Sequence, residues 1–290
     1  MSPHPITITH TDVEWCEAFI RYAPRVFPRI SFRKWYERGG WDEDYCAVAI
    51  TAGEEIIANA SLSRMTILLH GRELTGWQLG AVGVVPEHRG QGLQRMIMPR
   101  VLEFAASEDI MFLFANDDVL DFYPLFGFKR VHEVEFGADY AVTPARDRLR
   151  TLSLDSPEDR ALLVRVAASA SPLTELFGAR NYGGVLLWYW TNFYQERLYY
   201  CAESDAILIT EHEGDCLRIC DVLARNRLDL RSYLPRVARA PARHIKFGFT
   251  PGEWWPDARP IGAYDESPLF VRGDHALPTV PFKFPMLAQT

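Results

Sequence analysis

The turn Arg89-Gly90-Gln91-Gly92 stands between a strand-like apolar run and a segment with helical spacing. The first backbone N–H groups of a helix have no partner within the helix, and the helix dipole places partial positive charge there. Glycines allow that backbone to approach a ligand closely, while Arg89 adds charge or holds the loop. The turn therefore suits a phosphate or a pyrophosphate.

Three other interpretations of this turn follow from the residues alone. The first is a tight strand-to-helix connection that needs glycine only for its dihedral angles. A P-loop requires GxxxxGK followed by Ser or Thr, and no lysine follows Gly92, so this class is excluded. A dinucleotide-binding GxGxxG fails at its third glycine, where Arg95 stands, and the strands before the turn do not open a βαβ unit.

Two motifs of the chain resemble the GNAT superfamily of N-acetyltransferases. VGVVPEHRGQGL, residues 82–93, resembles the acetyl-CoA loop, whose signature R/Q-x-x-G-x-G/A begins here at Arg89 and ends at Gln94. Gln94 departs from the Gly or Ala of the signature. The later stretch LFANDDVLDFYPLFGFKRV resembles the family's next strand and a helix that ends in FY-x-x-x-GF. The motifs follow the family's order, and the resemblance extends over roughly residues 1–136.

The resemblance implies a fold, an acyl donor and a set of donor contacts. The implied fold is α/β (α+β), with a mixed, mostly antiparallel central sheet flanked by helices, and the donor is acetyl-CoA, without a metal. The backbone of Val82 and Val84 would pair with the pantetheine arm, and Asn116 would lie near the reactive end. The pyrophosphate would be held by the backbone N–H groups of one continuous run, Gly90, Gln91, Gly92, Leu93, Gln94 and Arg95.

The same resemblance assigns a catalytic role to Tyr123, which would give a proton to the leaving thiolate. A phenol with an ordinary pKa of about 10 keeps its proton at neutral pH and suits this task. The alternative is that Phe122, Tyr123 and Phe126 form a packed aromatic cluster. An acyltransferase with a cysteine nucleophile is disfavoured, because no cysteine lies in the two motifs.

The general base that must take the proton from the amine is not identified by the sequence. The carboxylates of Asp118, Asp121, Glu37 and Asp44 cannot be ranked. A further hypothesis is the carboxylate of Thr290, because the aminoglycoside-acetylating relatives use their own chain end as base.

The elements around the glycine turn follow from periodicity and turn residues. Residues 11–38 read as helical pieces interrupted by Pro24 and Pro28. Strand-like segments joined by short connections then predict an antiparallel meander, over residues 45–51, 56–69 and 74–85. Residues 92–106 have helical spacing with a kink expected at Pro99. A buried strand over 111–115 and a strand over 129–136 complete this half.

The second half reads as a degenerate copy of the first. When Pro235 is set on Pro99, LPRV aligns with MPRV, and strands flank both helices; Asn226 and Leu228 stand where the first half has its glycines. We expect a catalytic domain over residues 1–140, a linker over 141–157, and a degenerate GNAT-like domain over 158–290 that shapes the acceptor cleft. This arrangement is similar to the enhanced intracellular survival acetyltransferases, without their sterol-carrier-like domain.

The composition sets the broad class. With 290 residues and a net charge of −7, the chain is long enough for one or two domains and is not suited to nucleic acid as main partner. Five cysteines are scattered without a CxxC pair, which favours a reducing cytoplasm. No signal peptide and no apolar run near the ~20 residues of a membrane span are evident. We expect a cytoplasmic protein without a membrane partner, and a homo-oligomer is left open.

Two functions of different classes follow. The favoured one is an acetyl-CoA-dependent N-acetyltransferase that acts on a primary amine of a small molecule or peptide by direct transfer in a ternary complex. The alternative is a non-catalytic CoA-binding sensor or interaction protein that keeps the fold.

Overall fold

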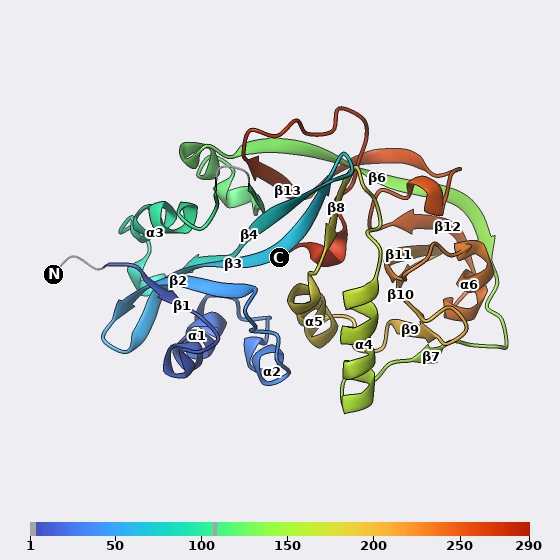
Figure 1. Ribbon diagram of the computed structural model, residues 1–290, viewed down its shortest axis with the longest axis horizontal. Helices are drawn as coiled ribbons and strands as arrows, with labels where there is room; N and C mark the ends of the chain where they lie inside the picture. The colour runs from blue at the N-terminus through green and yellow to red at the C-terminus, as the bar shows by residue number, and fades with distance from the viewer. Residues whose placement is uncertain (1–3, 107–108) are drawn as a thin grey trace.

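A single continuous sheet organises the molecule. The computed structural model describes residues 4–106 and 109–290. Within these residues the sheet has thirteen strands. Twelve of them follow the order β1-β2-β3-β4-β5-β13-β6-β12-β11-β10-β9-β7, and the remaining strand, β8, pairs with β3. The pairs β4–β5 and β11–β12 are parallel, and the other pairs are antiparallel. The expected fold class, a mixed and mostly antiparallel sheet flanked by helices, is confirmed (Figure 1).

The first half contains the predicted meander and the helix after the glycine turn. Its elements in chain order are β1 (Ile6–Ile8), α1 (Val13–Val26), α2 (Phe32–Glu37), β2 (Tyr45–Ala52), β3 (Glu55–Leu69), β4 (Arg72–Val84), the 3-10 turn η1 (Pro86–His88), α3 (Leu93–Leu102), β5 (Ile110–Phe114), the 3-10 turns η2 (Asp117–Val119) and η3 (Tyr123–Phe126), and β6 (Lys129–Val142). Figure 1 shows α1 and α2 on one face of the sheet and α3 on the other. Because helices cover both faces, β3 is buried over most of its length.

The second half contains a similar series. Its elements are β7 (Arg150–Thr151), α4 (Pro157–Ser169), β8 (Phe177–Arg180), α5 (Gly183–Asn192), β9 (Leu198–Cys201), β10 (Ala206–Glu213), β11 (Cys216–Leu223), α6 (Leu230–Val237), β12 (Ala242–Phe247), the 3-10 turn η4 (Gly252–Trp254), β13 (Arg259–Arg272) and the 3-10 turn η5 (Met286–Ala288). α4 starts at Pro157, and the Ser156 hydroxyl oxygen accepts the N–H of Asp159 at 3.1 Å.

The order of pairing in the second half repeats that of the first. β9, β10 and β11 form an antiparallel series, and a helix with an internal proline then leads to a parallel strand, as in β2, β3, β4, α3 and β5. The last strand of each half pairs beyond its own half, since β13 lies beside β5 and β6 lies beside β12. β6 and β13 also pair with each other, so the two halves share one sheet.

Two local expectations were wrong. Pro24 does not end the first helix directly, because α1 continues for two more residues to Val26. The polar stretch from residue 137 onward is not patternless, because β6 runs on to Val142 by pairing with β12. Residues 150–151 of the expected linker form β7. The domain boundaries themselves stay a prediction.

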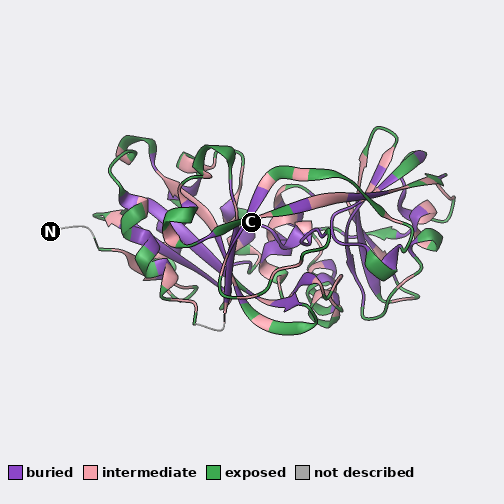
Figure 2. Ribbon diagram, turned by 90° about the horizontal axis from the view of Figure 1, so that it is seen from above, coloured by how far each residue is buried: buried purple, intermediate pink, exposed green. Residues whose placement is uncertain are grey.

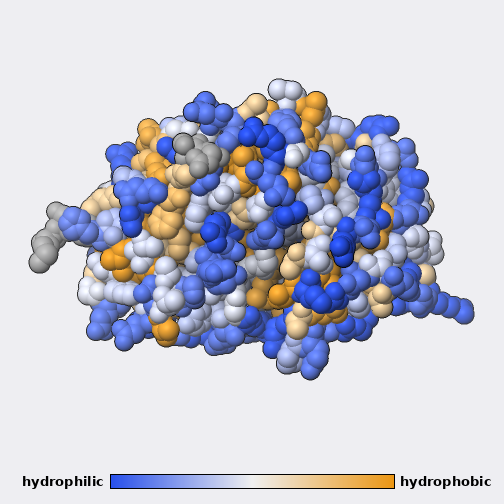
Figure 3. Space-filling model, viewed as in Figure 1, coloured by the Kyte–Doolittle hydropathy of each residue, from blue (hydrophilic) through white to orange (hydrophobic). Residues whose placement is uncertain are grey.

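The core lies along the sheet and under the helices. Figure 2 shows the strands largely buried, while exposed residues gather on the outer helices and on the β6 and β13 ribbon. On the face drawn in Figure 3, hydrophilic and hydrophobic residues are interspersed. The chain ends near the middle of the molecule, where Leu287 and Ala288 are fully buried (Figure 1). The C-terminal segment therefore contributes to the core.

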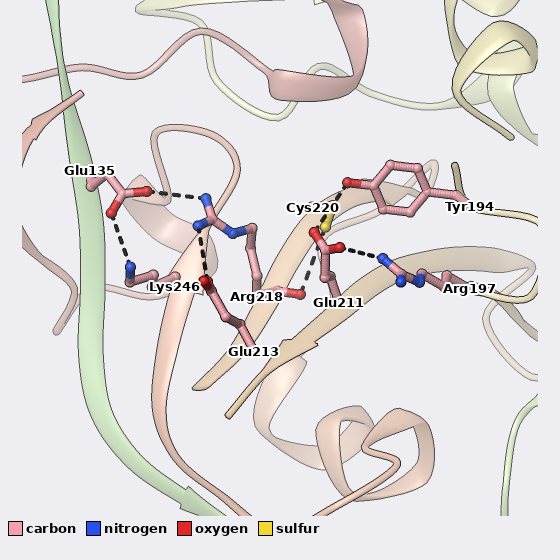
Figure 4. A network of polar contacts seen from close by, with 8 residues as sticks. All are labelled: Glu135, Tyr194, Arg197, Glu211, Glu213, Arg218, Cys220 and Lys246. Carbon is pink, nitrogen blue, oxygen red and sulfur yellow. Dashed lines mark hydrogen bonds and ion pairs between the residues drawn. The ribbon is translucent and has the colours of Figure 1, made fainter. Parts of the chain in front are cut away.

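A polar network joins β6 of the first half to β11 and β12 of the second half (Figure 4). Glu135 of β6 accepts hydrogen bonds from Arg218 of β11 at 3.1 Å, and its carboxylate lies 3.2 Å from the ammonium of Lys246 in β12. These neighbouring cations outweigh burial and lower the pKa of the Glu135 carboxyl below its ordinary value. On the adjoining strand Glu211 pairs with Arg197. Charges in this region are thus satisfied by one another.

Candidate functional site

The glycine turn adopts the conformation that its sequence suggests. Gly90 and Gly92 have φ values of 76° and 73°, in the left-handed region that favours glycine. No atom lies within 4 Å of where a Cβ at either position would stand. Glycine is therefore required for the backbone conformation and not for internal packing, and the space beside it is open to a ligand.

The N-terminus of α3 is left without a cap. Gly92 occupies the N-cap position and offers no side chain. The hydrogen bonds of the described residues include none donated by the backbone N–H groups from Gly90 to Gln94, whereas the N–H of Arg95 donates to the Gly92 carbonyl at 3.0 Å. A run of free donors at a helix N-terminus is suited to an anionic oxygen.

The end of β4 departs from the sheet beside this turn. β4 pairs with β5 only from Gly76 to Leu79, and a bulge follows, with Ala81 at a φ of 46°. After β5 ends, the N–H of Ala115 donates to Pro268 instead. The β4 backbone from Gly80 to Val84 therefore has no strand on its β5 side, which leaves an edge to which an extended chain could pair.

Gln94, which departs from the family signature, supports this edge. Its side-chain amide donates to the carbonyls of Asn59 at 2.9 Å and Gly83 at 2.7 Å. The Asn59 amide in turn donates to the Ala81 carbonyl at 3.0 Å. Instead of filling space needed by a ligand, Gln94 ties the N-terminus of α3 to the bulge of β4. Arg89 acts similarly, since its Nε donates to the Val84 carbonyl at 3.3 Å.

A cavity of about 1300 Å³ opens onto these elements. All of the site residues expected from the sequence line it, namely Val82, Val84, Arg89, Gly90, Gln91, Gly92, Leu93, Gln94, Arg95, Asn116 and Tyr123. The opposite wall comes from the second half, through α4, the start of α5, and Leu223 at the end of β11. The cavity is therefore bounded by both halves.

Tyr123 both packs in the core and lines the cavity. Its ring is 5% exposed and lies 5.4 Å from Phe122 and 5.9 Å from Phe270, measured between ring centroids. Burial raises the pKa of Tyr123 to about 12. The phenol thus keeps its proton throughout the physiological range. The aromatic cluster and the proton-donor role are compatible, because the cluster fixes the ring at the cavity wall.

The structure distinguishes the four carboxylates that the sequence could not rank by whether they line the cavity. Asp44, Asp118 and Asp121 line the cavity. Glu37 is not among the lining residues, and its carboxylate lies 3.9 Å from the guanidinium of Arg33. Sequence reasoning missed Asp42, which lines the cavity between α2 and β2 and whose pKa is raised by burial. No pattern around Asp42 could have indicated this, because its surroundings come from distant segments.

Thr290 also lies at the cavity wall. Its N–H and its hydroxyl donate to the side-chain oxygen of Gln78 on β4, at 2.5 Å and 3.0 Å. The Gln78 amide nitrogen donates to the Ala288 carbonyl at 2.7 Å. A Cβ at Gly80 would stand 2.4 Å from the Thr290 hydroxyl, so only glycine fits on β4 beneath this residue. Gln78 is fully buried and was not anticipated from the sequence.

The family comparison agrees with the two motifs. Residues 5–131 match the family model described as an acetyltransferase (GNAT) domain. The resemblance of this part of the chain to the GNAT acetyltransferases is therefore confirmed. The activity class that follows is acyl transfer. No curated protein matches the chain.

Several solved structures share the fold over nearly the whole chain. A GCN5-related N-acetyltransferase from Kribbella flavida is 17% identical, and the match covers 93% of this chain and 71% of that one, with a TM-score of 0.54. Eis1 from Mycobacterium abscessus is 14% identical over 91% and 72% of the two chains, with a TM-score of 0.55. A GCN5-related N-acetyltransferase from Anabaena variabilis is 14% identical over 93% and 72%, with a TM-score of 0.51. At these identities the likeness establishes the fold.

Membrane-spanning helices and metal-binding clusters are both missing from the described residues. No helix within residues 4–106 and 109–290 is long and apolar enough to cross a membrane. Over the same ranges, no group of three or more His, Cys, Asp or Glu side chains is arranged to hold a metal ion.

Proposed function

We propose that the protein is an acetyl-CoA-dependent N-acetyltransferase that transfers an acetyl group directly to a primary amine within a ternary complex. The observation that carries this proposal is one cavity that joins three features: the uncapped N-terminus of α3, the unpaired edge of β4, and Tyr123. Asn116 lines the cavity after the end of β5. These features match the needs of an anionic, extended acyl donor whose leaving group requires a proton.

Each feature has one task in the proposed reaction. The donors from Gly90 to Gln94 bind the pyrophosphate, and the free edge at Val82 and Val84 aligns the pantetheine arm. The amine nitrogen forms a bond to the thioester carbonyl carbon, whose oxygen is stabilised by a backbone N–H near Val84. The carbon–sulfur bond then breaks, and Tyr123 supplies the proton that the thiolate takes.

The test is thiol release from acetyl-CoA with a panel of primary amines, for the wild type beside Tyr123→Phe. We expect release with at least one amine, and a turnover number about 100-fold lower in the variant, the usual range for loss of a general acid. The affinity for acetyl-CoA should be unchanged, because the phenyl ring keeps the packing. Binding without release for any amine would favour the alternative, a non-catalytic CoA-binding sensor. Absence of binding would exclude both functions.

We further propose that the second half is a degenerate copy of the first and shapes the acceptor cleft. Two observations support this: the repeated order of strands and helices, and the wall of the cavity formed by α4 and α5. The acceptor itself is a small molecule or peptide that carries a primary amine.

The residue that takes the amine proton is proposed among groups at the cavity wall. The Thr290 carboxylate stays a hypothesis that the position of Thr290 beside Gly80 supports. Two variants test this hypothesis: one lacks the last four residues, and the other carries one extra glycine after Thr290. The extension moves the carboxylate and keeps the residue whose N–H and hydroxyl bind Gln78. Unchanged turnover in both variants would exclude Thr290 as the base.

A further inference from the structure

One carboxylate in the acceptor part of the cavity lacks a positive partner. Asp42 lies in the loop between α2 and β2, is half-buried, and lines the cavity. One of its oxygens accepts the N–H of Asp44 at 2.9 Å. The other oxygen, Oδ2, has no hydrogen-bond or ion-pair partner among the described residues. Because a shielded carboxylate without a cation is unfavourable, this oxygen is suited to a positively charged ligand.

Asp44 forms an ion pair with Arg64 at 2.7 Å, and Arg180 pairs with Glu73 at 3.2 Å, so these charges on this side of the cavity are paired. One nitrogen of Arg38 lies 3.8 Å from the exposed carboxylate of Asp155, and its buried Nη1 has no hydrogen-bond partner among the described residues. No hydrogen bond or ion pair joins Arg38 to Asp42 among the described residues. Asp118 and Asp121, on the far side near η2, are exposed to solvent. Asp42 therefore combines partial burial with an unneutralised charge.

The space around Asp42 is built from aromatic and backbone surfaces. Trp35 and Tyr45 both line the cavity, with ring centroids 4.9 Å apart. The Trp35 indole N–H is already used, since it donates to the Gly184 carbonyl at the start of α5 at 2.8 Å. A Cβ at Gly184 would stand 3.9 Å from Oδ2 of Asp42, so this oxygen faces the gap between the loop and α5. Trp35 and Tyr45 are buried and give this side of the cavity an apolar wall, which favours a cation with an apolar body.

Asp42 lies at a distance from the place where the acetyl group would be delivered. Tyr45 on β2, Ser63 on β3 and Gln78 on β4 are direct neighbours across the three strands. Strands lie about 4.8 Å apart, so the Asp42 loop is on the order of 10 Å from β4. A nitrogen held by Asp42 is therefore not the one that would react beside Gly80 and Val82. A nitrogen bound by Asp42 would instead be a second cation of the acceptor molecule, in addition to the amine that reacts.

We propose that the acceptor is a diamine, whose two nitrogens are joined by an apolar chain and whose distal ammonium is bound by the Asp42 carboxylate. This inference rests on the proposed function in one respect, namely that the second nitrogen is the one that accepts the acetyl group. The apolar chain would lie against the aromatic wall of Trp35 and Tyr45, and the second nitrogen would reach the acyl donor at β4.

The experiment compares two matched pairs of ligands, cadaverine with pentylamine and octamethylenediamine with octylamine. Binding is measured by calorimetry in the presence of desulfo-CoA, and thiol release from acetyl-CoA is measured separately. The wild type should bind a diamine at least about ten-fold more tightly than the matched monoamine, the worth of one charged hydrogen bond. Asp42→Asn keeps the hydrogen bond to Asp44 and should abolish this preference.

Glu43→Gln is the control, because Glu43 is the exposed neighbouring carboxylate and does not line the cavity. It should keep the preference for diamines. Equal affinity for mono- and diamines in the wild type, no binding of either, or a preference that persists in Asp42→Asn would overturn the proposal. A preference for diamines in binding without any thiol release would sink the proposed reaction and leave the Asp42 site standing.

Discussion

The two junctions between a strand and a proline-containing helix differ in what occupies the start of the helix. At the first, Gly92 precedes α3 without a side-chain cap. At the second, Asp229 precedes α6, and its carboxylate accepts the N–H of Arg231 at 3.2 Å. Serine 171 further fills the second junction, since its N–H and hydroxyl donate to the carbonyls of Ala224 and Arg225. The second helix thus caps one of its first N–H groups with its own side chain, whereas the first leaves these groups for a ligand.

The gaps where each strand leaves its parallel neighbour differ in the same way. Beside β4 the gap opens into the cavity. Beside β11 it is filled, because the N–H of Gly248 donates to Ile219 at 2.8 Å and the N–H of Met286 donates to Gly248 at 2.7 Å. A Cβ at Gly248 would stand 2.6 Å from the sulfur of Met286. The same arrangement of strands can therefore leave a gap that is open to a ligand or a gap that is filled by the chain itself, depending on a few local residues.

The largest effect is expected when the first junction is given the cap of the second. In Gly92→Asp the new carboxylate would accept the helix N–H groups and repel the pyrophosphate. Aspartate tolerates the left-handed conformation of Gly92 better than most residues but is still strained there, so we expect a modest fall in melting temperature that the new cap offsets in part. We expect the affinity for acetyl-CoA to fall about 100-fold, as measured by calorimetry. Affinity equal to the wild type would show that this junction does not bind the donor.

A smaller effect is expected from the support of the β4 edge. Gln94→Ala removes the donor to the carbonyls of Asn59 and Gly83. We expect the dissociation constant for acetyl-CoA to rise about ten-fold, the usual worth of one or two such hydrogen bonds. Gln94→Met keeps much of the size of the side chain without the amide donor and without a charge, and should behave alike. If only the alanine variant weakens binding, packing rather than hydrogen bonding would explain the role of Gln94.

Asp221, in the second half, is fully buried on β11. Replacing it should change the stability of the protein but not its affinity for acetyl-CoA. The Asp221 carboxylate accepts the hydroxyl of Tyr182 at 2.8 Å, and burial raises its pKa to about 7. The folded protein therefore holds a proton that the unfolded chain releases between about pH 4 and pH 7. Through this window the free energy of unfolding falls as pH rises.

Asp221→Asn removes that charge and keeps an acceptor for Tyr182. The variant should gain up to about 4 kcal/mol of stability at pH 8, and the gain should shrink toward pH 4. Denaturant unfolding at the two pH values measures it, with acetyl-CoA affinity as the control that should not change. A gain independent of pH would mean that the carboxyl does not titrate in this range.

The smallest effect is expected at the second helix start. Asp229→Ala removes the cap of α6 and should cost about 1 kcal/mol of stability, with no change in the binding of acetyl-CoA. Thermal unfolding and calorimetry measure the two quantities. Weaker donor binding in this variant would contradict the assignment of the donor to the first junction.

The sequence predicted those parts of the molecule that local patterns control. The glycine turn, the meander before it and the helix after it follow from turn residues and periodicity. It did not predict α5, whose residues from Val185 to Trp190 are apolar on all sides, nor β13, whose exposed stretch finds its partners 120 or more residues away. Segments distant in the sequence also form the surroundings of Asp42 and Gln78. The missing partner of the Asp42 carboxylate and the hydrogen bonds between Gln78 and the last residues exist only in the folded structure, so the sequence could not indicate them.

The most direct test is a crystal structure of the protein with bound CoA. We expect the pyrophosphate on the backbone N–H groups from Gly90 to Gln94, and the pantetheine arm along β4 at Val82 and Val84. A nucleotide bound at the start of α6, or a β4 edge left empty while CoA binds elsewhere, would contradict this expectation.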